Sequence, residues 1–156
     1  MNMVIREARE ADKQAINALR KQVLLVHAAG KPEFFPGIFS KELADHLNVL
    51  FMQENAEVLV AESDNELLGF ACIEYIDRPG SPYRMPARYC HVIEFGVGEG
   101  HRRQGIGRAL FESVKARAAE RGFSRIELDM WEFNEGALAF YEAIGFRTYR
   151  RYMEYT

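Results

Sequence analysis

The sequence has little cysteine. Cys72 and Cys90 are the two cysteines among 156 residues, which is too few for a disulfide scaffold, and they form no C-x-x-C pair of the kind that binds zinc. We therefore expect both thiols to be reduced and packed as small apolar groups, in a cytoplasmic protein. H-E-x-x-H is also missing, so the sequence predicts no metal site.

Long apolar runs are missing too. No stretch approaches the roughly 18 apolar residues of a membrane span, and charged residues within the first seven positions interrupt any signal-peptide core. We expect neither export nor a membrane as partner. Apolar residues make up 48% of the chain, which excludes a disordered protein, and the length favours a single domain over residues 1–156.

An excess of positive charge is absent as well. The 20 Lys and Arg residues against 23 Asp and Glu residues leave a net charge of −3, which is unsuited to neutralising a nucleic-acid backbone. Arg147, Arg150 and Arg151 would be divided between the two faces of a final strand. Nucleic acid is therefore not an expected partner, and any anion site must be local.

The residue pattern predicts alternating helices and strands. Strands are expected at residues 4–8, 58–61, 67–76, 89–97, 123–131 and 146–155, and helices at 11–27, 41–52, 106–121 and 135–143. The expected caps are Ser40, Gly122, Asn134 and Gly145. The apolar stripe of the first helix comprises Ala15, Ile16, Leu19, Val23 and Val26. This order predicts an α/β sandwich.

Two loops interrupt the pattern. Residues 32–39 are rich in Pro, Gly and Phe, and we expect Phe34 and Phe35 either to cover a core or to form one wall of a pocket. Residues 77–82 form a second loop by composition. Carboxylates near these loops, such as Glu33, would suit a cationic amine, although exposed carboxylates are usually solvated.

A glycine-rich turn over residues 96–108 joins a predicted strand to the most regular predicted helix. Unpaired amides at a helix start bind anions, and the arginines of this turn add local positive charge. A Walker A loop is excluded because Ile106 and Gly107 stand where Lys and Ser or Thr are required. A dinucleotide fingerprint fails because its third glycine would fall at His101 or Arg103. A turn that is glycine-rich for packing alone is the remaining alternative.

Residues 102–107, Arg-Arg-Gln-Gly-Ile-Gly, fit the R/Q-x-x-G-x-G/A signature of the GCN5-related N-acetyltransferases. Residues 134–146 resemble the same family's N-x-x-A-x-x-F-Y-x-x-x-G-F block, in the expected order and separation. The resemblance is specific over roughly residues 85–150. It implies a three-layer α/β sandwich with a mixed, mostly antiparallel central sheet that is splayed at its middle strands and covered by helices on both faces.

The resemblance also implies where acetyl-CoA binds. The backbone of Phe95 and Val97 would pair with pantetheine, and the turn would hold the diphosphate. The residues implied for the turn are Arg102, Arg103, Gln104, Gly105, Ile106, Gly107 and Arg108. Asn134 would bond near the pantetheine, cap the following helix, or do both.

The candidate catalytic residues follow from the same resemblance. Tyr141 looks like the general acid that protonates the departing thiolate, with a core tyrosine as the alternative. His91 falls where many relatives have Glu, whereas Glu94 supplies a carboxylate, and strict alternation puts the two on opposite faces unless a bulge intervenes. We favour Glu94 as the base and keep a water-mediated route open. The Val97 N–H would stabilise the thioester oxygen.

The sequence thus predicts an acetyl-CoA-dependent N-acetyltransferase. The acetyl group would pass directly, in a ternary complex, to a primary amine of a small molecule or peptide. The alternative is a non-catalytic CoA-binding or interaction module with the same fold. A homodimer is left open.

Overall fold

A five-stranded sheet forms the middle layer of the computed structural model, which describes residues 2–156. Its strands lie in sequence order and are β1 (Val4–Glu7), β2 (Ala56–Ser63), β3 (Glu66–Arg78), β4 (Ala87–Val97) and β5 (Ile126–Glu127). Neighbouring strands are antiparallel except β4 and β5, which are parallel. The short two-residue turn between β2 and β3, with positive φ at Asp64 and Asn65, makes these two strands the predicted hairpin.

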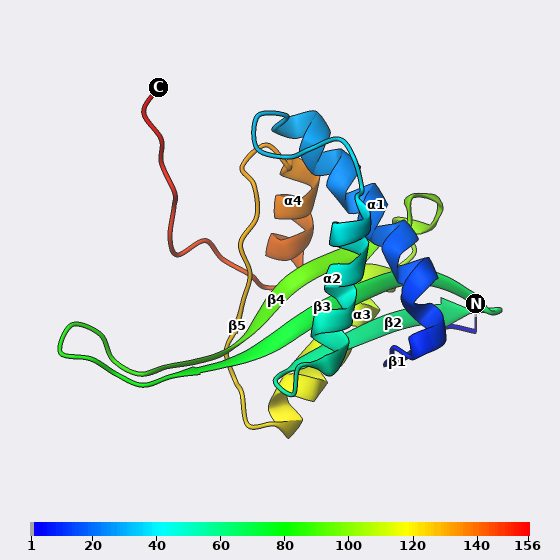
Figure 1. Ribbon diagram of the computed structural model, residues 1–156. Helices are drawn as coiled ribbons and strands as arrows, with labels where there is room; N and C mark the ends of the chain where they lie inside the picture. The colour runs from blue at the N-terminus through cyan, green and yellow to red at the C-terminus, as the bar shows by residue number, and fades with distance from the viewer. Residues whose placement is uncertain (1) are drawn as a thin grey trace.

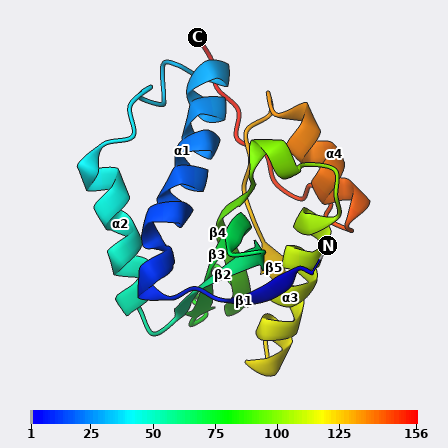
Figure 2. The ribbon, with the colours of Figure 1, turned by 90° about the vertical axis from the view of Figure 1, so that its right-hand side faces the viewer.

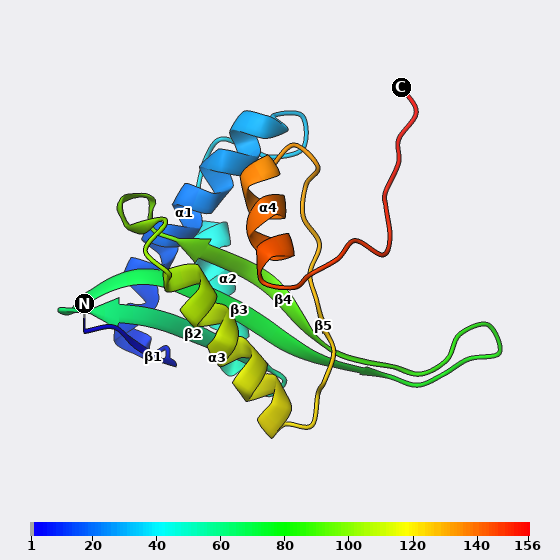
Figure 3. The same cartoon turned by 180° about the vertical axis from the view of Figure 1, so that it is seen from behind.

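Helices cover both faces of this sheet (Figures 1 and 2). One face carries α1 (Lys13–Gly30), which follows a short 3-10 turn at Glu10–Asp12, and α2 (Lys41–Met52). The other face carries α3 (Ile106–Glu120) and α4 (Glu135–Ala143), as Figure 3 shows from behind. The predicted three-layer sandwich with a mixed, mostly antiparallel sheet is confirmed.

Two apolar clusters fill the spaces between the layers. The cluster under α3 includes Leu110 and Val114 together with Cys90 and Val92 of the sheet. The cluster under α1 and α2 is centred on residues such as Ile16, Leu47, Val60, Phe70 and Cys72. Both cysteines are free and fully buried, as the sequence predicts. Because strand residues alternate between faces, one sheet can supply both clusters.

The helix ends confirm the predicted caps. The Ser40 Oγ accepts a hydrogen bond from the Leu43 N–H at 3.1 Å, and the Asn134 Oδ1 accepts one from the Ala137 N–H at 3.1 Å. Gly122 and Gly145 follow α3 and α4 with φ angles of +78° and +108°. Glycine adopts this left-handed conformation without the steric cost that a side chain brings.

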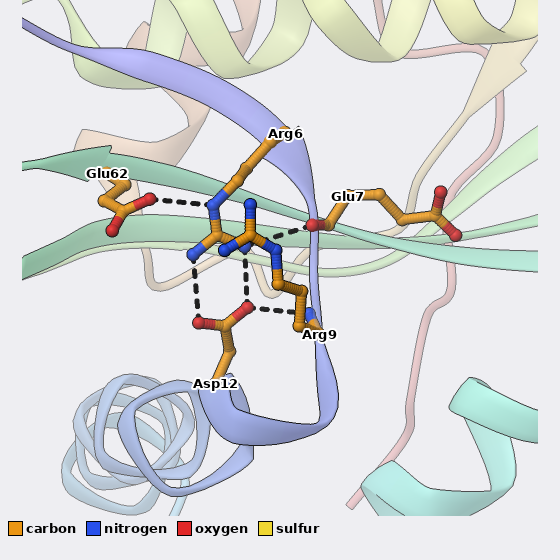
Figure 4. Close-up of polar contacts among 5 residues, drawn as sticks. All are labelled: Arg6, Glu7, Arg9, Asp12 and Glu62. Atoms are coloured by element: carbon orange, nitrogen blue, oxygen red, sulfur yellow. Dashed lines mark hydrogen bonds and ion pairs between the residues drawn. The ribbon is translucent and has the colours of Figure 1, made fainter. Parts of the chain in front are cut away.

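A cluster of charged side chains fixes the start of α1 against the sheet (Figure 4). Two nitrogens of Arg6 in β1 donate to the two carboxylate oxygens of Asp12 at 2.7 and 3.0 Å, and the Arg6 Nε donates to Glu62 of β2 at 2.7 Å. Asp12 also accepts from the Arg9 N–H at 2.7 Å. These bonds hold the pKa of the Asp12 carboxyl below its usual value.

Two predicted strands differ in the structure. The strand expected at residues 123–131 is reduced to Ile126–Glu127, because β5 pairs with β4 at two residues and then diverges. The final strand expected at 146–155 is wrong: Phe146 packs against the core, but the following residues form no regular structure and are exposed. Arginines and tyrosines lie on both of its alternating faces, so an extended chain there has no apolar face to bury.

The β3–β4 hairpin extends beyond the sheet as an arm with Tyr83 and Met85 exposed near its tip (Figure 3). The arm lengthens both predicted strands, since β3 reaches Arg78 and β4 begins at Ala87. Across residues 2–156, none of the helices combines the length and apolar character that crossing a bilayer requires.

Candidate functional site

The two parallel strands of the sheet separate shortly after they meet. β5 pairs with β4 at Cys90 and His91, and beyond His91 no described residue pairs with that edge of β4. The Gly98 N–H donates to the Leu68 carbonyl of β3 at 2.8 Å. Because backbone groups alternate between the two edges of a strand, the N–H and C=O groups of Phe95 and Val97 face the gap that β5 leaves. This gap exposes a row of unused backbone hydrogen-bonding groups.

The glycine-rich turn closes one end of the gap. Arg103 and Gly105 adopt positive φ angles of 63° and 80°, so the chain folds back sharply before α3 begins at Ile106. Within residues 2–156, nothing accepts a hydrogen bond from the backbone N–H groups of residues 102–108. A contact with α1 also holds the turn, because the Gln22 side chain accepts a hydrogen bond from the Glu99 N–H at 2.9 Å. The sequence offered no clear signal for this last contact.

The arginines of this turn are available to a ligand. Arg102, Arg103 and Arg108 are exposed, and in the described part of the chain none of them forms an ion pair with a carboxylate. Three positive charges therefore surround unpaired amides at the positive end of the α3 dipole. Such an arrangement binds an anionic group such as a diphosphate.

α4 packs tightly against this end of the site. A Cβ added at Gly107 would lie 3.0 Å from the Phe140 ring, so the two helices approach closely at this glycine. The Phe95 ring lies 5.9 Å from that of Phe140 and 6.3 Å from that of Tyr141, measured between centroids. Burial raises the pKa of Tyr141 to about 12. Tyr141 therefore keeps its proton near the open edge of β4 at neutral pH.

A β-bulge in β4 brings the two predicted base candidates to one face. Cys72 pairs with Glu94 and Ile73 with Val92, which leaves Ile93 without a partner on β3. Val92 packs in the α3 cluster, whereas Ile93 packs in the α1 and α2 cluster. Because of this extra residue, Glu94 and His91 lie on the same face of β4. Strict alternation, which would put them on opposite faces, therefore does not hold here.

Glu94 is bound to a buried arginine. The Arg20 Nε donates to one carboxylate oxygen at 2.7 Å and the Arg20 Nη2 to the other at 3.3 Å. Arg20 is 3% exposed, and its remaining nitrogen donates to Asn17 and to the Leu43 carbonyl. Sequence reasoning missed Arg20, although its place beside Ile16 and Leu19 on the helix surface was a signal that a charge is buried there.

His91 is engaged by carboxylates. Its Nδ1 lies 3.1 Å from Glu74 of the neighbouring strand, and its Nε2 lies 3.9 Å from Asp129. Glu74 is also within hydrogen-bond distance of the Gln53 amide. His91 therefore belongs to a polar group toward the hairpin arm, whereas Glu94 lies under α1.

An aromatic wall lies at the C-terminal end of α1. We use this name for His27, Phe34, Phe35, Trp131 and Phe133. The His27 and Phe35 rings stack at 5.0 Å, and Trp131 lies 5.3 Å from Phe34 and 5.1 Å from Phe35. The wall joins the loop after α1 to the segment after β5.

Comparison with known proteins places this arrangement in a family. Residues 26–146 match the model of the acetyltransferase (GNAT) family. The chain belongs to that family. The match includes the open edge of β4, the turn before α3 and the whole of α4.

Individual relatives agree with this assignment. N-acetyltransferase 8F1 of Rattus norvegicus is 26% identical over 127 residues, which are 80% of this chain and 55% of the rat protein. Mycothiol acetyltransferase of Salinispora tropica is 32% identical over 99 residues, 63% of this chain and 31% of that protein. The chain thus spans about half or less of the length of these relatives.

Solved structures of other bacterial proteins have the same fold. A mutant of the BH1408 protein of Bacillus halodurans superposes with a TM-score of 0.94 at 26% identity, covering 98% of each chain. A predicted acetyltransferase from Clostridium acetobutylicum, solved with acetyl-CoA, superposes with a TM-score of 0.74 at 22% identity, covering 99% of this chain and 96% of the other.

Proposed function

We propose that this chain is an acetyl-CoA-dependent N-acetyltransferase that transfers the acetyl group directly to a primary amine of a small molecule or peptide. One observation carries the proposal: the unpaired edge of β4 leads into a turn whose amides are unpaired and whose three arginines are exposed. A long ligand with amides in one part and phosphates in another fits both.

The residues present fit acetyl-CoA in order along the site. The backbone of Phe95 and Val97 would pair with the pantetheine amides, and the amides and side chains of residues 102–108 would hold the diphosphate. Asn134 already caps α4 and would contribute at most its remaining polar groups. The structure of a Clostridium acetobutylicum relative with acetyl-CoA supports this choice of cosubstrate.

The predicted acid fits its role. Tyr141 lies beside Phe95 and stays protonated at neutral pH, so its O–H can donate to the thiolate of CoA as the carbon–sulfur bond breaks. The N–H of Val97, on the open edge, would stabilise negative charge on the thioester oxygen. Glu94 and His91 share the α1 face, from which the amine would approach, and both are candidates for receiving its proton.

Direct transfer is supported by the cysteines. An acyl-enzyme route would need a reactive thiolate, yet Cys72 and Cys90 are both fully buried. Burial raises the pKa of the Cys72 thiol well above its usual value and that of Cys90 to about 12. A ternary complex therefore accounts for transfer without a covalent intermediate.

Names of relatives suggest the kind of acceptor to screen. AAC(6')-Iy, an aminoglycoside N-acetyltransferase, superposes with a TM-score of 0.79 at 18% identity. A ribosomal-protein-alanine N-acetyltransferase from Brucella melitensis superposes with a TM-score of 0.69 at 22% identity. We would screen aminoglycosides, polyamines and peptides with free N-termini.

The experiment combines binding with turnover. Acetyl-CoA should raise the melting temperature of the protein, and the amine panel should release free CoA thiol. Arg102→Gln with Arg108→Gln should weaken acetyl-CoA binding about tenfold or more. The matched control, Arg147→Gln with Arg151→Gln, removes the same charge from the exposed C-terminal segment and should not. Absence of any shift with acetyl-CoA would refute the proposal, and binding without transfer would favour a CoA-binding module.

A further inference from the structure

The proposed transfer needs a group that takes a proton from the amine, and both predicted candidates are already occupied. The two carboxylate oxygens of Glu94 accept from Arg20. Neither oxygen of that carboxylate is therefore without a donor in the structure. His91 lies between two carboxylates, with Glu74 at 3.1 Å and Asp129 at 3.9 Å. We therefore looked for a third group that could accept the proton and that has no partner in the structure.

His27 lies on the surface of α1 that faces the open part of β4. Arg20 on this surface reaches Glu94. One turn further along, Val23 lies so close to Gly96 that a Cβ added there would be 2.8 Å from it. His27 follows one more turn along the same stripe, since residues four apart share a helix face. This position is on the face of the sheet opposite α3, beyond the contact of Val23 with Gly96.

The segment after β5 meets His27 from the other side of the gap. The Phe133 ring lies 6.3 Å from the imidazole in an edge-to-face arrangement, and the stacked Phe35 ring covers its flank. Phe133 also lies directly on the backbone of Gly30, where an added Cβ would overlap its ring. α1 and the segment after β5 therefore hold the imidazole between the Phe35 and Phe133 rings.

The imidazole nitrogens of His27 are not engaged. Among residues 2–156, no side chain or backbone group forms a hydrogen bond or ion pair with them. Phe35 and Phe133 present apolar rings, so a nitrogen lone pair is free for a ligand. In this respect His27 differs from both Glu94 and His91.

The charges around His27 favour its neutral form. Burial lowers the pKa of the imidazole below its usual value, and the negative charge of Glu94 on β4 offsets part of this effect. On its own helix, Arg20 balances Glu94. Lys31, just after α1, is paired with Glu33 of the following loop and with Glu154. At neutral pH the imidazole is thus uncharged and can accept a proton.

We propose that His27 is the base that deprotonates the acceptor amine. This inference rests on the acetyl transfer proposed above. The imidazole takes one proton from the ammonium group, and the free amine nitrogen forms a bond to the thioester carbon. The carbon–sulfur bond then breaks, and Tyr141 protonates the sulfur and regains a proton from the new amide nitrogen. His27 finally releases its proton to water.

The test compares variants at one position across pH. His27→Gln and His27→Phe remove the base, and the second keeps the ring that stacks on Phe35. With acetyl-CoA and an amine that the wild type accepts, kcat/KM of both should fall about 10² to 10⁴-fold. The acid limb of the wild-type pH profile, which lies below pH 6.5 because the pKa is lowered, should disappear. His46→Gln, on the exposed side of α2, is the matched control and should change neither.

Further measurements separate a chemical role from a structural one. Added imidazole should restore activity to His27→Ala, and acetyl-CoA should raise the melting temperature of each variant as it does for the wild type. If the substituted proteins do not fold, the pKa of His27 measured by NMR in the CoA-saturated wild type must match the acid limb of the wild-type profile. A mismatch would overturn the inference.

The outcomes distinguish this inference from the function on which it rests. A wild-type protein that transfers acetyl to no amine would refute the proposed function and the role of His27 together. A wild type that transfers, with His27→Gln unchanged in rate and in pH profile, would refute the role of His27 alone. Loss of the acid limb in Glu94→Gln or His91→Gln but not in His27→Gln would assign the base to that residue instead.

Discussion

Burial of one hydroxyl determines how Tyr141 can act. Its pKa of about 12 means that the phenol carries its proton at every pH at which the protein is normally assayed. We therefore predict that Tyr141→Phe lowers kcat about 10²-fold or more and leaves acetyl-CoA binding within a factor of about three. Initial-rate kinetics and calorimetric titration would check both. An unchanged kcat would mean that the hydroxyl only packs.

Arg20 is a buried charged residue whose loss should cost considerable stability. Its removal would leave Glu94, Asn17 and the Leu43 carbonyl without their donor. We predict that Arg20→Met lowers the free energy of unfolding by about 2–4 kcal/mol, measured by urea denaturation. The control is Lys115→Met, which breaks an exposed pair with Glu112 and should cost under about 0.5 kcal/mol. Equal effects would contradict the role assigned to Arg20.

The first helix shows what residue types can and cannot reveal. Ile16, Leu19 and Val23 face inward as predicted, but Ala15 and Val26 are exposed, and Arg20 and His27 occupy inward positions. An apolar pattern identifies the helix and its approximate face. It cannot identify a charged residue whose partner, Glu94, lies 74 positions away in the sequence, because the pairing exists only once the sheet forms.

The contacts between β1 and the start of α1 make stability depend on acidity. Asp12 has a lowered pKa in the folded protein because Arg6 and the Arg9 N–H donate to it. The unfolded chain therefore binds the proton more readily, so this stabilisation is complete above about pH 4 and is lost as pH falls through the folded pKa. We predict that Asp12→Asn lowers the free energy of unfolding by about 1–3 kcal/mol at pH 7. Wild type and variant should converge in acid, and parallel curves would contradict the argument.

The approach of α3 to α4 can be tested with two glycines. At Gly107 a methyl group would lie 3.0–3.1 Å from the Phe140 ring, whereas at Gly136 it would meet nothing within 4 Å. Gly107→Ala should therefore destabilise the protein by about 1–3 kcal/mol and weaken acetyl-CoA binding. Gly136→Ala should stabilise α4 by about 0.5–1 kcal/mol. Thermal denaturation with and without acetyl-CoA distinguishes the effect on stability from the effect on acetyl-CoA binding. An unchanged melting temperature for Gly107→Ala would show that α3 and α4 can move apart at little cost.

Helices and strands could be predicted from the sequence where their ends depend on neighbouring residues alone. Side-chain and glycine caps predicted ends of α2, α3 and α4, whereas α1, which has no side-chain cap, runs from Lys13 to Gly30 instead of the predicted 11–27. Alternation predicted β4. The length of β5 was not predictable, since it depends on where β5 leaves β4 and not on its own residues. The bulge at Ile93 is likewise a property of two paired strands, so sequence alone left the faces of Glu94 and His91 open.

At the scale of the whole molecule, the C-terminal segment should be dispensable for folding. Beyond Phe146, its contacts with the rest of the chain include Arg125 over the Tyr149 ring and the Lys31–Glu154 pair. We predict that ending the chain after Arg147 changes the free energy of unfolding by less than about 1 kcal/mol, because exposed contacts contribute little. Phe146→Ala, which removes a ring packed on Phe111, should cost about 2–3 kcal/mol. A large loss on truncation would show that the segment is covered in solution.

The layered fold and the place of the turn were predictable from sequence because they rest on two motifs and on periodic patterns. The roles of single side chains at the site were harder to predict, because segments that are distant in the sequence supply them. Tyr141 and the Arg102–Arg108 turn come from the motifs themselves. Arg20, His27 and Phe133 come from a helix and a loop that carry no motif, and their contacts with Glu94 and with each other form only in three dimensions: Arg20 with Glu94, and His27 with Phe133.

The unpartnered Ile93 has a consequence for protein engineering. The pairs on either side of it, Val92 with Ile73 and Glu94 with Cys72, would become consecutive if it were deleted. Every remaining side chain would keep its face, and the bulge would be lost together with the packing of Ile93 under α1 and α2. Deleting this one residue would therefore remove the bulge while keeping Glu94 and His91 in the chain. The deletion variant would show how much acetyl transfer depends on the shape of β4 and how much on the side chains that it carries.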